Sequence, residues 1–276
     1  MRIRSSAPLA SLVFLLACGP DPRPHDGSDG ATWHPPDAST AKADARLPRK
    51  DSGAARYVMW AHSKSTLYAI DPETFTLTTV GNFANGDNIT DLAVTPDGTV
   101  YGISAAKLYV VDRETGKASY SADVPGKTNV GMTFLPDGSL LAADSEGGVR
   151  RINPTSGLVN ELGAFGGAYA TAGDLVAVAD GTMYAISDKG PHGDEFENNL
   201  LLVVNPASGK VTKEVGGIGF GQVFGCAYAN GHVYAFTNAG QLIEIDRTTG
   251  EGTLRKTYPG IEFWGAGVSP LVPPVE

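Results

Sequence analysis

The chain has 276 residues, of which 35 are glycine and 42% are hydrophobic, so it can form a core and many tight turns. Its formal charge of −9 argues against nucleic acid as a partner, because a phosphate backbone is bound through Lys and Arg. The same charge argues against docking on anionic lipid through a basic patch.

Residues 1–17 predict a secretory signal peptide. Arg2 and Arg4 make the start positive, and residues 7–17 form an apolar run of eleven. A helix that spans a membrane needs about 20 residues, so this run is too short to be one.

The apolar run ends in "LLAC", with Cys18 as its last residue. This ending resembles the lipobox of bacterial lipoproteins, in which the signal is cut before the cysteine and the thiol takes a diacylglyceryl group. The resemblance implies an exported protein whose acylated Cys18 holds it in a lipid bilayer. Gly19 stands where Asp often retains a lipoprotein in the inner membrane, which implies the outer membrane, on its periplasmic or surface face. The alternative is an ordinary signal peptide followed by a chance cysteine.

Residues 18–55, which begin at the lipidated cysteine, predict a disordered tether. The stretch is rich in Pro, Gly and Asp and has almost no branched aliphatic side chains, so it cannot bury a core. Pro-rich linkers stay fairly extended. We therefore expect the tether to hold the folded part away from the membrane.

A five-fold repeat follows. The related stretches are "LYAIDPETF", "LYVVDRETG", "VRRINPTSG", "LLVVNPASG" and "LIEIDRTTG", whose turn-forming residues are Asp71, Asp112, Asn153, Asn205 and Asp246. The intervals are 41, 41, 52 and 41 residues, which indicates a repeat architecture. Each Asp or Asn is expected to accept a hydrogen bond from the backbone two residues later, before a left-handed glycine. Phe75 replaces that glycine in the first copy and predicts a strained or widened turn.

A second signal accompanies the first in each unit. The stretches "TPDGTVYGIS", "LPDGSLLAAD", "VADGTMYAIS" and "YANGHVYAFT" predict pairs of strands joined by two-residue Asp-Gly or Asn-Gly turns. Each unit therefore contains four short strands, and such sheets bury their two apolar faces by stacking around an axis. The sequence predicts an all-β protein, a five-bladed β-propeller over residues 56–272, with residues 273–276 as a tail.

The ends of the repeat region predict how the ring closes. "EFWGAGVSP" near the C-terminus is similar to "NITDLAVTP", and "VMWAHSKSTLYAID" near the start of the region matches "TVYGISAAKLYVVD". A C-terminal strand would thus complete the sheet that the N-terminal strands begin. An open solenoid is the structural alternative, and it would need caps at both ends.

The repeats resemble those of the YVTN and quinoprotein-like propeller superfamily. The stretches "FGQVFGCAYANGHVYAFT" and "FWGAGVSP" also resemble a group of uncharacterised secreted proteins of myxobacteria. These motifs imply fold and export rather than chemistry. The tryptophan-docking pattern of alcohol-oxidising quinoproteins is not recognisable, so no quinone cofactor is predicted.

The long interval contains an insertion, "DKGPHGDEFENN", at 188–199. Its carboxylates are candidate oxygen ligands for Ca²⁺: Asp188, Asp194, Glu195 and Glu197. Their spacing matches no EF-hand loop. The alternative is a solvated acidic loop.

A second candidate site lies where the inner strands converge at the channel mouth. The alignment of the repeats places Asp91, Asp174, Phe224 and Trp264 near that end. His62 replaces an apolar residue on the next strand of the sheet, and Trp60 lies two residues before it. Such a group could contact a small ligand, and two carboxyls at one opening could act as acid and base. The alternative is that the acids cap strand ends and the histidine belongs to the core. Another residue, Cys226, is predicted to be a small buried thiol.

Two functions from different classes remain. The first is a membrane-anchored envelope lipoprotein whose propeller binds a small-molecule ligand or a protein, with no catalytic residues and no cofactor assigned. The second is a propeller hydrolase or lyase that acts on a carbohydrate or lactone, with Ca²⁺ as its candidate cofactor.

Overall fold

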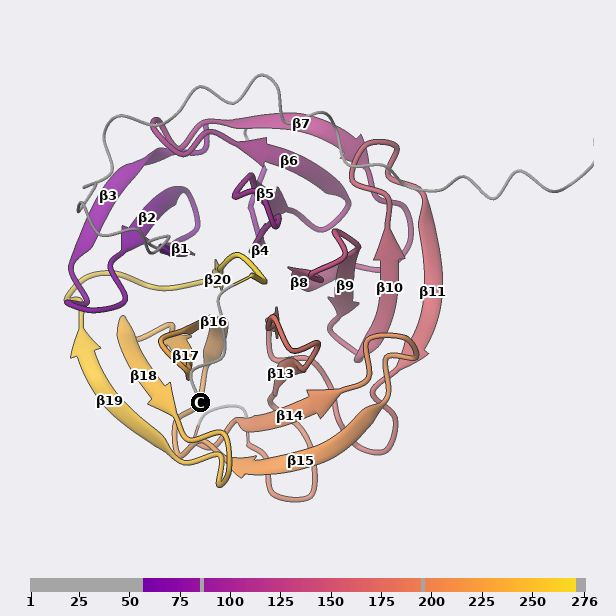
Figure 1. Ribbon diagram of the computed structural model, residues 1–276, viewed down its shortest axis with the longest axis vertical. Helices are drawn as coiled ribbons and strands as arrows, with labels where there is room; N and C mark the ends of the chain where they lie inside the picture. Colours follow the sequence, from indigo (N-terminus) through magenta and orange to yellow (C-terminus); the bar gives the residue numbers. More distant parts are fainter. Residues whose placement is uncertain (1–56, 85–86, 195–196, 272–276) are drawn as a thin grey trace, which may run out of the picture. The chain divides into compact units, whose positions relative to one another are not determined.

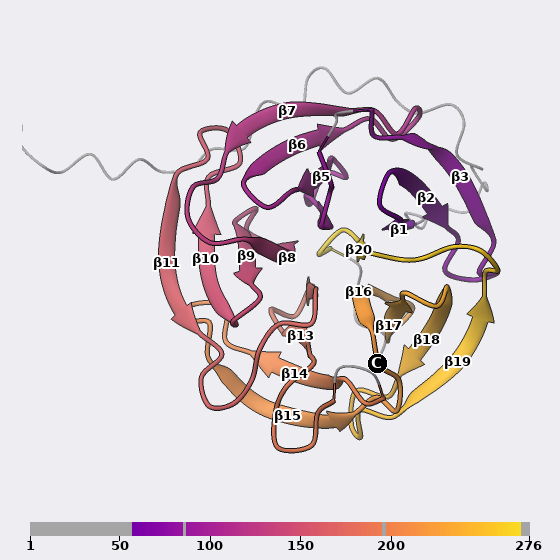
Figure 2. The same cartoon turned by 180° about the vertical axis from the view of Figure 1, so that it is seen from behind.

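The computed structural model describes residues 57–271, with gaps at 85–86 and 195–196. Within these ranges the chain forms twenty β-strands, arranged as five antiparallel sheets of four strands around one axis (Figures 1 and 2). This part of the protein is a five-bladed β-propeller, as the repeat predicts. The predicted signal peptide, Cys18, the tether and the tail at 273–276 lie outside the described residues.

Each blade runs from an inner strand near the axis to an outer strand at the rim. Blade one consists of β20 (Gly265–Gly267), β1 (Met59–His62), β2 (Thr66–Ile70) and β3 (Leu77–Asn82). Blade two consists of β4 (Asp91–Val94), β5 (Val100–Ile103), β6 (Lys107–Val111) and β7 (Ala118–Asp123). Blade three consists of β8 (Asn129–Phe134), β9 (Leu140–Asp144), β10 (Gly148–Ile152) and β11 (Val159–Ala164). Blade four consists of β12 (Leu175–Ala177), β13 (Met183–Ser187), β14 (Leu200–Val204) and β15 (Val211–Gly217). Blade five consists of β16 (Val223–Ala229), β17 (His232–Thr237), β18 (Gln241–Ile245) and β19 (Gly252–Thr257).

The last strand closes the ring. In Figure 1, β20 in yellow lies beside β1 in indigo, and the two are paired antiparallel, with Gly265 opposite His62 and Gly267 opposite Trp60. The predicted closure is therefore confirmed, and the open solenoid is wrong. A closed ring also leaves every inner strand in contact with two neighbouring blades.

The repeated Asp and Asn residues form the predicted turns between the third and fourth strands of the blades. In all five copies the side-chain Oδ1 accepts a hydrogen bond from the backbone N–H two residues later, at 2.7–3.0 Å. Phe75 adopts a left-handed φ of 53°, which is uncommon for a residue with a side chain. Its N–H still donates to the Asp71 carbonyl at 2.8 Å, as Gly116 does to Asp112. The first turn is therefore strained but not widened.

The hairpins between the first and second strands differ from the prediction in three blades. Thr95 N–H donates to the Thr99 carbonyl at 2.9 Å, so three residues form the loop, and Gly98 has φ of 89°. A type I turn followed by a left-handed glycine produces this geometry. The Asp-Gly pairs at 137–138 and 180–181 lie in equivalent loops. Only the Asn-Gly pair at 230–231 forms a two-residue turn, because Ala229 pairs directly with His232.

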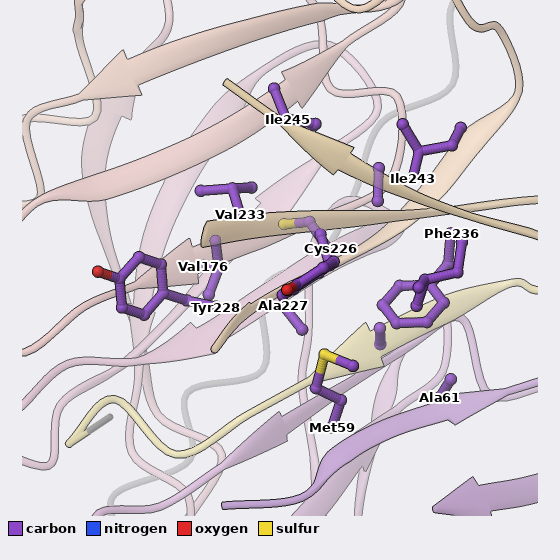
Figure 3. Packing of buried hydrophobic residues seen from close by; sticks show 14 of the residues in the cluster. Met59, Ala61, Val176, Cys226, Ala227, Tyr228, Val233, Phe236, Ile243 and Ile245 are labelled. Carbon is purple, nitrogen blue, oxygen red and sulfur yellow. The ribbon is translucent and has the colours of Figure 1, made fainter. Parts of the chain in front are cut away.

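The hydrophobic core lies between the blades. Along β1, Trp60 packs with residues of blade two, whereas Met59 and Ala61 pack with residues of blade five. Figure 3 shows Cys226 and Tyr228 of blade five in the same cluster as Met59 and Ala61. Cys226 is completely buried and is not in a disulfide, as predicted. No helix that could span a membrane occurs in the part of the chain that the structure describes.

Candidate functional site

The five inner strands place one residue each at the same register position around the axis. In the ladders, Asp91 lies opposite Ile103, Gly131 opposite Ala143, Gly225 opposite Phe236 and Gly265 opposite His62. Asp174, directly before β12, occupies the fifth position, because its carbonyl accepts a hydrogen bond from Ile186. We call these five residues the axial ring: Asp91, Gly131, Asp174, Gly225 and Gly265.

The glycines of the axial ring make room for its two carboxyl groups. A β-carbon on Gly265 would lie 2.5 Å from both Asp91 Oδ1 and His62 Nε2. A β-carbon on Gly131 would lie 3.0 Å from the Cα of Asp174. Side chains larger than hydrogen at these positions would therefore force the strands and the acids apart.

The two axial acids are completely buried and accept hydrogen bonds from main-chain groups, some of them in other blades. Asp91 Oδ2 accepts from the Met132 N–H of β8 at 2.6 Å. Asp174 Oδ2 accepts from the Cys226 N–H of β16, and its Oδ1 accepts from Leu175 at 2.5 Å. The two side chains also share a hydrogen bond with each other, which requires a proton on one of them.

Burial raises the pKa of both axial acids well above the ordinary range, because a charged carboxylate loses its hydration there. The negative charge of Asp174 raises the pKa of Asp91 further. Burial and the charges of the two acids also raise the pKa of Cys226, so its sulfur remains a thiol.

The structure places His62 beside this pair. Its ring is completely buried, and Nδ1 lies 2.8 Å from the Ser63 carbonyl, so Nδ1 carries the hydrogen. Burial lowers the pKa of His62 to about 4, and the carbonyls of Ser63 and Thr90, which favour the charged ring, offset only part of that effect. The ring is therefore neutral at pH 7, and its bare Nε2 points toward Gly265 and Asp91.

Trp264 and Trp60, the other two residues predicted for this site, lie at different distances along the chain from the axial ring. Trp264 directly precedes the axial ring, and its backbone N–H donates to the His62 carbonyl at 2.8 Å. Trp60 is 3% exposed and lies toward the opposite end of its strand. The structure thus groups Asp91, Asp174 and His62 and separates Trp60 from them.

Trp60 lines a surface pocket of about 210 Å³ between blades one and two. The pocket combines aromatic, charged and hydroxyl side chains: Tyr57, Trp60, Asp97, Arg113 and Ser269. The Arg113 guanidinium has no ion pair or hydrogen bond with any of the described residues. We call this feature the blade-one/two pocket.

The insertion at 188–199 forms the whole loop between β13 and β14. Asp194 Oδ1 accepts a hydrogen bond from the Glu197 N–H at 3.0 Å, and the exposed His192 contacts Glu214 at 2.7 Å. Glu195 lies outside the described residues. Among the residues that the structure does describe, no three His, Cys, Asp or Glu side chains are grouped to hold a metal ion. The Ca²⁺ site stays a prediction.

Blade three contains a buried ion pair that the sequence reasoning missed. Arg150 NH2 lies 3.0 Å from Asp144 Oδ2, and the two side chains are 1% and 3% exposed. Asp144 Oδ1 accepts from the N–H groups of Glu146 and Gly148. The repeat alignment carries the signal, because Arg150 stands where the other four copies have Tyr68, Tyr109, Leu202 and Ile243.

No protein-family model and no curated protein matches this chain in sequence. A chain of the nidogen–laminin complex matches with a TM-score of 0.54 and 12% identity, over 77% of this chain and 97% of that one. Hydrazine synthase from Kuenenia stuttgartiensis matches with a TM-score of 0.42 and 20% identity, over 69% and 59% of the two chains. Virginiamycin B lyase from Staphylococcus aureus matches with a TM-score of 0.42 and 15% identity, over 74% of this chain and 67% of that one. The fold occurs in 1144 matching chains, so the similarity shows a β-propeller and does not single out one function.

Proposed function

We propose that this protein is an exported lipoprotein of the cell envelope, anchored in the outer membrane through Cys18, and that its propeller is a binding module. The anchor rests on Arg2, Arg4, the apolar run and the "LLAC" ending. Acyl chains contribute about 0.8 kcal/mol for each CH₂ that enters the bilayer, so two or three chains hold a protein firmly. A β-propeller is generally a rigid scaffold that presents loops and pockets for binding.

The blade-one/two pocket is the observation that carries the binding function. Tyr57 and Trp60 supply aromatic surface, and Arg113 supplies a cation that forms no ion pair or hydrogen bond among the described residues, although its charge acts on the neighbouring Asp112. Guanidinium groups bind carboxylates through paired hydrogen bonds. The ligand that fits is therefore a small molecule or peptide side chain with an apolar part and a carboxylate.

The axial acids give less support to the hydrolase or lyase alternative. A general acid and base must lie within hydrogen-bond reach of the substrate. Asp91 and Asp174 are 0% exposed, and their oxygens accept hydrogen bonds from main-chain groups of β8, β12 and β16. A substrate would reach them only if the inner strands separated.

Binding is tested by a thermal-shift screen of the purified full-length chain against aliphatic and aromatic carboxylates and short acidic peptides. A ligand that binds only the folded form raises the melting temperature. We expect at least one of these compounds to do so, and Arg113→Gln to remove the effect. Arg247→Gln is the matched control, because Arg247 follows Asp246 in blade five as Arg113 follows Asp112, but lies over Tyr228 rather than in the pocket. Equal loss in both variants would count against the pocket.

Anchoring is tested by labelling cells with a fatty-acid precursor and separating membrane from soluble fractions. Cys18→Ser should lose the label and leave the membrane fraction. Cys226→Ala should keep both, because the Cys226 thiol is buried. Unchanged membrane retention of Cys18→Ser would mean that Cys18 is not the anchor.

A further inference from the structure

The hydrogen bonds of the axial acids are distributed unequally. Both oxygens of Asp174 accept from main-chain N–H groups, those of Leu175 and Cys226, and the Ala266 N–H of β20 also reaches this side chain. In Asp91, Oδ2 accepts from the Met132 N–H and the Leu92 N–H also reaches the side chain, but among the described residues no N–H or hydroxyl group lies at hydrogen-bond distance from Oδ1. A carboxylate that faces several donors is stabilised in its charged form. The shared proton therefore belongs on Oδ1 of Asp91.

These contacts join all five blades. Asp91 belongs to β4 and binds β8 of blade three through Met132. Asp174, next to β12 of blade four, binds β16 of blade five through Cys226 and β20 of blade one through Ala266. The hydrogen bond between the acids links the two groups of strands.

We propose that protonated Asp91 donates a hydrogen bond to the Asp174 carboxylate, and that this bond is a proton-dependent clasp on the closed ring of blades. When the proton leaves, two buried negative charges face each other at the axis, and the hydrogen bond between them disappears. The clasp makes the stability of the propeller depend on pH. This inference is independent of the proposed function.

Two other titratable groups face the clasp. His62 of β1 lies against Asp91 across Gly265, and Cys226 of β16 contacts Asp174. Because burial lowers the pKa of His62 to about 4, the histidine keeps one charge state above neutral pH. Burial raises the pKa of Cys226 well above its ordinary value, so the thiol keeps its proton as well. The acid pair is thus the group at the axis that is expected to lose a proton as the pH rises.

The direction of the pH effect follows from linkage. A carboxyl whose pKa is raised by folding binds a proton more tightly in the folded state than in the unfolded chain, where its pKa is about 3.9. Its stabilising contribution is complete below that value and is lost as the pH rises through the folded pKa. One proton per molecule corresponds to a fall in melting temperature of roughly 4 °C per pH unit in a domain of this size.

The test compares Asp91→Asn with Asp174→Asn in the full-length chain, with melting temperatures measured from pH 6.5 to pH 9. Asn at 91 keeps an acceptor for Met132 and donates to Asp174 without a titratable proton, so this variant should fold and lose the alkaline fall. Asn at 174 would turn one NH₂ toward the N–H groups of Leu175 or Cys226, so this variant should be destabilised throughout.

An infrared spectrum gives a second readout. At pH 7.5 the wild type should show the band of a protonated carboxylic acid, and Asp91→Asn should lack it. An alkaline fall in Asp91→Asn equal to that of the wild type would overturn the proposal. So would a wild type with no protonated-acid band, or an Asp174→Asn variant that behaves like Asp91→Asn.

Discussion

Among the described residues, a carboxylate is buried at two places, and the two places balance its charge in different ways. In blade three, Asp144 faces the Arg150 guanidinium at 3.0 Å. At the axis, Asp174 faces another acid, Asp91, which must carry a proton. An isolated buried charge is costly, so each site needs a compensating group. A guanidinium is a permanent partner, whereas a proton can leave with a change in pH, and that difference separates a fixed structural contact from a switchable one.

The largest effect is expected from breaking the permanent pair. Arg150→Met removes the buried cation that pairs with the Asp144 carboxylate, which stays buried. Loss of one partner from a buried ion pair lowers the free energy of unfolding by about 3–5 kcal/mol. Urea denaturation of the purified chain measures this loss.

A double variant separates the charge from the packing. In blade four, the positions of Asp144 and Arg150 are occupied by Ser187 and Leu202, so Asp144→Ser with Arg150→Leu converts blade three to the pattern of its neighbour. Replacement of a buried pair by residues that pack well is often neutral or stabilising. We expect the double variant to recover most of the stability. A double variant as unstable as Arg150→Met would show that packing, not the unpaired charge, explains the loss.

The next largest effect is expected from His62, which lies beside the axial acids and makes the stability of the protein depend on pH at acidic values. Its folded pKa of about 4 lies below the value of 6.5 in an unfolded chain. Between these values the unfolded chain binds the extra proton, so stability is present above pH 6.5 and is lost as the pH falls toward 4. The full change is about 3 kcal/mol, since each pKa unit corresponds to 1.36 kcal/mol.

The variant His62→Phe removes this acid-sensitive contribution. Phe is the residue at the equivalent position of blade five, Phe236. The difference in unfolding free energy between variant and wild type should shift by about 3 kcal/mol in favour of the variant between pH 7.5 and pH 4. Urea denaturation at the two pH values measures it. A constant difference would mean that His62 does not stay neutral in the folded protein.

Much of the fold was predictable because it is encoded locally and repeated. The turn residues from Asp71 to Asp246 hold the same hydrogen bonds in every blade, so their spacing alone indicated the number of units. The hairpin lengths were not predictable from Asp-Gly, because the residue before it can join the loop. That difference shifts the register by one residue in blade five, where the turn at 230–231 is shorter, and it is why Gly225 rather than Phe224 lies in the axial ring.

The sequence predicted which residues lie together at the channel mouth, but not that they are buried there. The alignment brought Asp91, Asp174 and His62 to one end of the inner strands, and they do lie together. What a linear pattern does not show is how closely the strands approach. The glycines at 131, 225 and 265 allow contact distances that bury the acids, so the expected open mouth is a closed hydrogen-bonded centre.

The smallest effect is expected at the rim of the blade-three pair. Lys127 Nζ lies 3.6 Å from Asp144 Oδ2 and 2.7 Å from Glu146 Oε2, but the lysine and glutamate side chains are 60% and 75% exposed. Water and salt screen exposed pairs, which contribute little to stability. Lys127→Gln should therefore change the melting temperature by less than about 2 °C, and the change should shrink further in 1 M salt. A larger fall in melting temperature that persists in 1 M salt would show that Asp144 requires Lys127 as well as Arg150. The buried charge of Asp144 would then be compensated by two cations instead of one.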